Sequence, residues 1–95
     1  MMIKKIDILQ DYIEIVEEKK GIFGIKEYVS KINIESIDKI ERLIEDNKLI
    51  GIVLWNKNDV LHAIGFKNYK DNLEDIYNKI SSTIKNSIEI METDL

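Results

Sequence analysis

The chain has no cysteine, no proline and a single histidine among its 95 residues. Without cysteine it can form neither disulfide bonds nor thiolate metal sites, and nothing indicates its redox compartment. The histidine, His62, has no second histidine to complete a usual zinc site, so we interpret it as a half-buried strand residue. The sequence also lacks a nucleophile–base pair and a glycine-rich phosphate loop. We therefore expect no enzymatic activity, no metal or other cofactor and no small-molecule substrate.

Long apolar stretches are absent as well. No segment approaches the roughly 20 apolar residues that cross a bilayer as a helix. Asp7 follows closely on the start Met1-Met2-Ile3-Lys4-Lys5, which leaves no room for the hydrophobic region of a signal peptide. These absences predict a cytoplasmic protein with no membrane insertion.

Basic residues are outnumbered: 18 acidic against 14 basic residues give a net charge of −4. Proteins that bind nucleic acids usually carry a basic surface, because neutralisation of phosphates drives their affinity. Nucleic acid is therefore a disfavoured partner. Isoleucine and lysine are abundant, while Ala63 and Arg42 are the only alanine and arginine. An AT-rich genome imposes this composition, so the number of lysines by itself indicates no function.

Apolar residues make up 44% of the chain, which is enough for one packed core. We expect a single domain over residues 1–95, with its core in residues 6–67. Apolar side chains at helical spacing predict three helices in the first half, at residues 6–18, 25–32 and 36–47. The first has two adjacent apolar stripes and ends at Gly21, and the third has an acidic exposed arc.

A β-hairpin is the clearest local signal. Two β-rich runs, Leu49–Trp55 and Val60–Phe66, flank the turn residues 56–59. Pairing Trp55 with Val60 gives a hairpin with two apolar faces, although an antiparallel hairpin normally leaves one face to water. We expect a partner or the last helix to cover the second face. Its predicted partner-binding residues are Trp55, Val53, Val60, His62 and Ile64.

The last segment predicts a long helix over about residues 71–91. It begins at Asp71-Asn72-Leu73-Glu74, which resembles a capping box. A helix of this length extends beyond the rest of the predicted core. We therefore expect a homodimer through its second half, with a dimerisation surface made of Tyr77, Ile80, Ile84, Ile88 and Met91.

The predicted order of elements, three helices and then a hairpin, resembles the winged helix-turn-helix superfamily. Residues 25–29 resemble the positioning helix, residues 37–44 the recognition helix and residues 45–50 its exit into the wing. The apolar pairs Leu43-Ile44 and Leu49-Ile50, followed by Gly51-Ile52, are most similar to the PCI-type winged helices of multi-subunit assemblies. The resemblance implies an α+β winged helix, with three helices, a two-stranded wing and a long C-terminal helix.

The resemblance to PCI-type domains implies a protein–protein interaction module, either dimeric or a subunit of a larger assembly. As an alternative, a winged-helix transcription regulator would contact DNA through Lys39, Arg42 and Lys57, although the recognition-helix arc is net acidic. A second alternative is a dimerisation scaffold. The hairpin at residues 50–66, followed by a long helix, also resembles the first half of the Roadblock-type (longin-like) fold.

Overall fold

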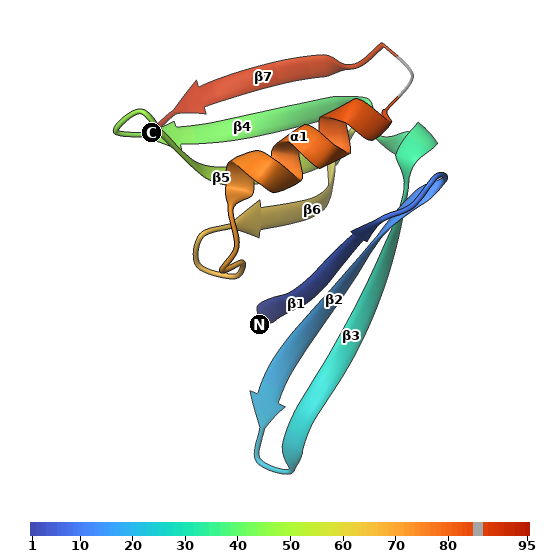
Figure 1. The fold of residues 1–95 in the computed structure, drawn as a ribbon, viewed down its shortest axis with the longest axis vertical. Coiled ribbons are helices and arrows are strands. Elements are labelled where there is room, and N and C mark those ends of the chain that lie inside the picture. The colour runs from blue at the N-terminus through green and yellow to red at the C-terminus, as the bar shows by residue number, and fades with distance from the viewer. Residues whose placement is uncertain (85–86) are drawn as a thin grey trace.

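The structure is a computed structural model, and it describes residues 1–84 and 87–95. Within these residues the chain forms seven strands, one α-helix and one short 3-10 helix, so it is mainly β (Figure 1). No helix in this part of the chain is long and apolar enough to span a membrane. In chain order the elements are β1 (Met2–Ile8), β2 (Tyr12–Gly21), β3 (Gly24–Asn33), η1 (Ile34–Ser36), β4 (Lys39–Glu45), β5 (Lys48–Asn56), β6 (Asp59–Gly65), α1 (Leu73–Thr83) and β7 (Glu89–Asp94).

The first sheet is a three-stranded antiparallel meander of β1, β2 and β3. Successive side chains on a strand point to opposite faces. Ile13 and Ile15 on β2 and Ile32 on β3 are buried on one face, while Glu14 and Lys31 are paired across the strands on the other. This alternation of apolar and charged residues turns one face of the sheet to the core.

The β2–β3 hairpin is longer than β1. Pairing with β1 ends at Met2 opposite Glu18, whereas β2 and β3 stay paired as far as Gly21 and Gly24. Residues 19–26 therefore form a two-stranded segment, which we call the arm end. Figure 1 shows that it projects away from the second sheet and the helix.

The second sheet has the strand order β6-β5-β4-β7. The β4–β5 hairpin turns through Asp46 and Asn47, whose φ angles are 51° and 63°. Two successive positive φ values are the type I′ geometry that suits two-residue hairpins. After β6 the chain passes through α1 and returns as β7, which pairs with β4 in parallel.

The helix α1 covers one face of the second sheet, which we call the inward face (Figure 1). It begins after Asn72, whose side chain accepts a hydrogen bond from the backbone nitrogen of Asp75 at 3.1 Å. The core lies between α1, the first sheet and the inward face. Its fully buried side chains are Ile13, Ile15, Ile40, Ile52, Leu54, Ile64 and Ile80.

The structure contradicts the predicted winged helix. The segments predicted as helices at residues 6–18, 25–32 and 36–47 are largely strand, with only a 3-10 turn between the last two. The two apolar stripes of the first predicted helix belong to two paired strands, in which Ile6 lies opposite Ile15 and Ile8 opposite Ile13. Isoleucine is β-branched and fits a pleated, half-buried surface better than a helix.

Both winged-helix functions lose their basis with that fold. The PCI-type interaction module and the DNA-binding regulator both require a helix-turn-helix. Residues 1–84 and 87–95 contain none. The turn at Asp46-Asn47 explains the error in the third predicted helix. Asp46 and Asn47 join β4 to β5 through a tight turn, at the place where the predicted helix would end.

The long C-terminal helix is also wrong, because α1 ends at Thr83. Three successive hydroxyl side chains occupy its last turn, and they donate to carbonyls three or four residues back, a competition with the backbone that weakens helices. The Roadblock-type scaffold needed the same long helix and is contradicted with it. The predicted dimerisation residues are divided among α1 (Tyr77, Ile80), the following segment (Ile84, Ile88) and β7 (Met91).

The predicted hairpin is confirmed as β5–β6, but its register differs. Trp55 lies opposite Val60 as expected. A register shift next to this pair then places His62 opposite Leu54, one residue away from the predicted pairing. A one-residue shift exchanges the two faces of a strand. His62 and Ile64 therefore lie on the inward face of the second sheet.

Candidate functional site

The five predicted partner-binding residues lie on two different faces. Trp55, Val53 and Val60 are on the outward face of the second sheet, opposite the core. Ile64 is buried on the inward face, and His62 Nε2 lies 3.4 Å from Glu17 Oε1 on β2. His62 is therefore part of the contact between the two sheets. The structure does not bring these five residues together as one surface.

Trp55 already has partners inside the protein. Its Nε1 donates to Glu41 Oε1 at 3.1 Å, and Lys39 Nζ lies 4.7 Å from the ring centroid. On the same sheet, a shallow apolar hollow of about 310 Å³ includes Gly51 and Gly65 in its lining. The use of this outward face by a protein partner or a second copy stays a prediction.

The three residues predicted to contact DNA are also separated. Lys39 lies on the outward face, Arg42 on the inward face and Lys57 in the β5–β6 turn. The Arg42 guanidinium donates to Glu74 Oε1 at 2.9 Å and stacks on the Tyr77 ring at 4.2 Å. The hydrogen bonds with Glu74 raise the pKa of Arg42. Arg42 thus joins α1 to the second sheet.

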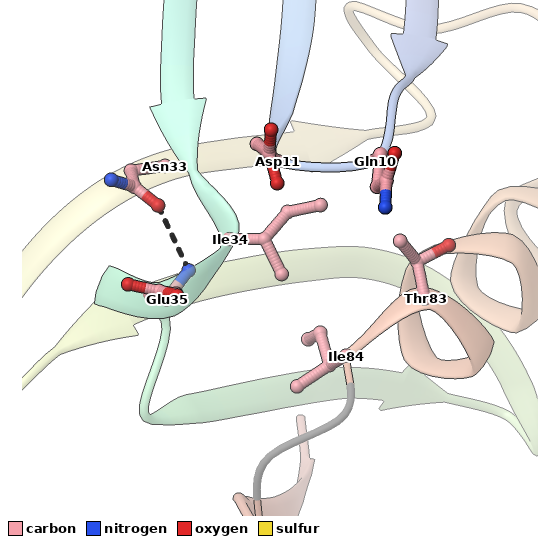
Figure 2. A pocket seen from close by; sticks show the side chains of 7 residues that line it. All are labelled: Gln10, Asp11, Asn33, Ile34, Glu35, Thr83 and Ile84. Atoms are coloured by element: carbon pink, nitrogen blue, oxygen red, sulfur yellow. Dashed lines mark hydrogen bonds between the residues drawn. The ribbon is translucent and has the colours of Figure 1, made fainter.

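A polar pocket lies near the start of β2, the end of β3 and the end of α1 (Figure 2). Its volume is about 430 Å³. Figure 2 shows Asp11 and Gln10 on one side and Thr83 on another, while the Asn33 side chain accepts a hydrogen bond from the Glu35 backbone at 3.0 Å. The lining residues are Gln10, Asp11, Asn33, Ile34, Glu35, Thr83 and Ile84.

This pocket supports no reaction class. Its ionisable lining groups are the carboxylates of Asp11 and Glu35, with no base–nucleophile pair beside them. Elsewhere in the described residues, no group of three or more histidine, aspartate or glutamate side chains is placed to hold a metal ion. The pocket combines hydrogen-bonding groups with the apolar side chains of Ile34 and Ile84, and it carries no catalytic assignment.

The arm end carries the most exposed large apolar side chains that the structure describes. Phe23 and Ile22 form its turn and are 101% and 96% exposed. Ile25, on the following strand, is 59% exposed. Gly24 completes the turn with a φ of 119°, a backbone conformation open to glycine. Clustered apolar exposure of this kind makes the arm end a candidate interaction site.

Three lysines flank the apolar turn. Lys19 lies directly opposite Lys26 in the β2–β3 register, and Lys20 lies opposite Ile25. Like charges in directly opposed positions destabilise a sheet. None of the three lysines forms an ion pair with an acidic group in the described part of the chain. The arm end therefore keeps a basic zone that folding does not neutralise.

The acidic residues next along the arm are already paired. Lys4 Nζ on β1 lies 2.6 Å from Glu27 and 3.4 Å from Glu18. The hydrogen bond with Glu27, followed by that with Glu18, raises the pKa of Lys4. From its end inward, the arm thus presents an apolar zone, a basic zone and an acidic zone whose two carboxylates are partly offset by one lysine.

The sequence analysis missed this site because it assigned Gly21 as a helix end. A signal is nevertheless present: two large apolar residues stand between Gly21 and Gly24, with lysines on both sides. This pattern indicates an apolar hairpin tip only if the flanking segments are strands. Interpreting them as helices concealed it.

Comparisons of the chain with protein-family models, with curated proteins and with solved structures found no match. The arm end is therefore the basis of the functional proposal.

Proposed function

We propose that this protein is a non-catalytic binding domain whose arm end is the binding element. The observation that carries the proposal is the complete exposure of Ile22 and Phe23 at the end of a projecting hairpin. Burial of a large apolar side chain stabilises by roughly 1.5–3 kcal/mol. Folding gains nothing from these two side chains, whereas a partner that covers them gains from both.

The rest of the fold supports the arm as a preorganised element. Ile13, Ile15 and Ile32 anchor the base of the β2–β3 hairpin in the core. β1 then pairs with β2 as far as Glu18, so only residues 19–26 have no third strand beside them. A hairpin held in this way loses little conformational entropy when it binds. The polar pocket, with two carboxylates and no nucleophile–base pair, supports no competing catalytic proposal.

The proposal is tested with immobilised protein and native lysate. Retained protein, lipid phosphorus and nucleic acid are each quantified, so the chemistry of the partner is left open. The test variant is Ile22→Ser/Phe23→Ser, and the matched control is Leu9→Ser/Phe66→Ser, which removes two other exposed apolar side chains. We expect the test variant to retain about tenfold less material, as loss of a binding hot spot does, and the control to behave like the wild type.

Equal retention by the wild type and Ile22→Ser/Phe23→Ser would show that the arm end is not the binding element. Because both positions are exposed, circular dichroism should show both variants folded. A loss shared by the control pair would point instead to non-specific apolar binding.

A further inference from the structure

We propose that the arm end docks on the surface of an anionic lipid bilayer. Ile22 and Phe23 enter the boundary between headgroups and acyl chains, and the basic zone of the arm end contacts the lipid phosphates. This inference rests on the proposed function above, in which the arm end is the binding element.

The apolar zone and the basic zone of the arm are spaced to match the acyl-chain boundary and the phosphates of a bilayer. A strand rises by about 3.4 Å per residue, so the Lys19–Lys26 pair lies about 7 Å behind the Gly21–Gly24 pair. Interfacial segments bury apolar side chains about 5–10 Å into the boundary between headgroups and acyl chains. Apolar residues at the tip therefore reach that boundary while the lysines stay at the depth of the phosphates.

The charge of the arm end complements an anionic surface. Lys19, Lys20 and Lys26 are three positive charges without ion-pair partners in residues 1–84 and 87–95. The carboxylates of Glu18 and Glu27 share Lys4, which limits their repulsion from lipid phosphates. Basic residues are attracted to a bilayer only within about a Debye length of it, so the net charge of −4 on the whole chain matters less than the local charge.

The exposed residues lie on both faces of the hairpin, which favours a bilayer over a protein groove. Lys20 and Ile25 are directly paired and share one face, while Lys19 and Lys26 share the other. The tip residues Ile22 and Phe23 are open on all sides. A hairpin that enters a lipid surface end-on is contacted from all sides, whereas a groove covers one face.

The sequence alone predicted no membrane insertion, because no segment is long enough to span a bilayer. A peripheral contact needs no such segment. It requires a few apolar residues at a tip and basic residues behind them, and their spatial arrangement exists only in the folded hairpin.

The test is co-sedimentation with vesicles of phosphatidylcholine containing roughly 30% phosphatidylserine, compared with vesicles of phosphatidylcholine alone. We expect the wild type to bind the anionic vesicles, and added salt to weaken the binding. Two variants should each lower the partition coefficient about tenfold or more: Ile22→Ser/Phe23→Ser, and Lys19→Gln/Lys20→Gln/Lys26→Gln. The matched control for charge is Lys48→Gln/Lys57→Gln/Lys67→Gln, which alters net charge equally at exposed sites outside the arm end.

Insertion depth is measured with a fluorophore, because the chain contains no cysteine and a single introduced one is labelled uniquely. An environment-sensitive label on Ile22→Cys should shift to the blue with anionic vesicles and be quenched by brominated acyl chains. The same label on Val60→Cys, on the outward face of the second sheet, should do neither.

Three outcomes overturn the lipid proposal: no binding of the wild type at about 1 mM lipid, equal binding of all variants, or equal binding to uncharged vesicles. If vesicles fail to bind but retention from lysate still depends on Ile22 and Phe23, the binding domain stands and its partner is an acidic protein or a nucleic acid. If lysate retention is also independent of these residues, both proposals fall.

Discussion

Arg42 is the only arginine of the chain, and its surroundings explain why an arginine occupies this position. The guanidinium contacts Glu74 on α1 and, at 3.1 Å, Glu92 on β7. It also stacks on Tyr77, and its side chain is 14% exposed. A planar, forked guanidinium bonds Glu74 through two nitrogens and Glu92 through a third while it stacks on the ring, a geometry that a compact ammonium group does not offer. A residue predicted to contact DNA therefore joins three elements of the fold.

We expect Arg42→Lys to lower the free energy of unfolding by roughly 1 kcal/mol, because one ammonium cannot replace the paired hydrogen bonds. The partner glutamates are half exposed or more, so solvent screening keeps the loss modest. Urea denaturation measures it. Lys48→Arg, an exposed change of the opposite kind, serves as the reference. An unfolding free energy unchanged within experimental error would mean that the cluster contributes no net stability.

At the scale of elements, local sequence signals identified the elements whose formation depends on neighbouring residues alone. The β5–β6 hairpin has an asparagine- and aspartate-rich turn, and α1 has Asn72 as its cap, within three residues of the group that it bonds. The signals beside β2, β3 and β4 are ambiguous, because Gly21 and Asp46-Asn47 can end a helix as well as turn a hairpin. The apolar residues of β1 to β4 fit helical spacing as well as strand alternation, and only cross-strand pairing decides between them.

The turn of the arm end depends on one glycine. Gly24 has a φ of 119°, which an L-residue adopts only with strain. Gly24→Ala should destabilise the β2–β3 hairpin by about 1 kcal/mol or more. Hydrogen exchange of the arm amides measures this local loss. Gly21→Ala is the control, because its added methyl group meets only Gly24 O at 3.6 Å, an ordinary contact. Equal exchange in both variants would contradict the assigned turn.

At the scale of the whole molecule, the two sheets are held together by side chains. The apolar core supplies most of this contact, and the Glu17–His62 pair joins β2 to β6 at its edge. Both side chains are largely buried, at 12% and 14% exposure. This pair connects the sheet that carries the arm to the sheet that carries α1.

A double-mutant cycle tests this connection. Glu17→Gln and His62→Gln should show a coupling free energy of about 0.5–1 kcal/mol, because residues in direct contact are not additive. Thermal or urea unfolding of the four proteins gives the value. The reference cycle combines Glu17→Gln with Glu45→Gln at the β4–β5 turn, where additivity is expected. Additivity in both cycles would mean that the Glu17–His62 pair contributes nothing to the contact between the sheets.

The sequence by itself determined the features that depend on neighbouring residues: one hairpin with its turn, the start of one helix and the absence of a membrane-spanning helix in the described residues. Only the tertiary structure decided the rest. β7 is a strand because β4 has an open edge beside it, and nothing in residues 89–94 alone requires this. The arm end is exposed because β1 stops pairing at Met2 while β2 and β3 continue. Such features form only when backbone groups distant in sequence pair with each other, and local periodicity does not determine which strands pair.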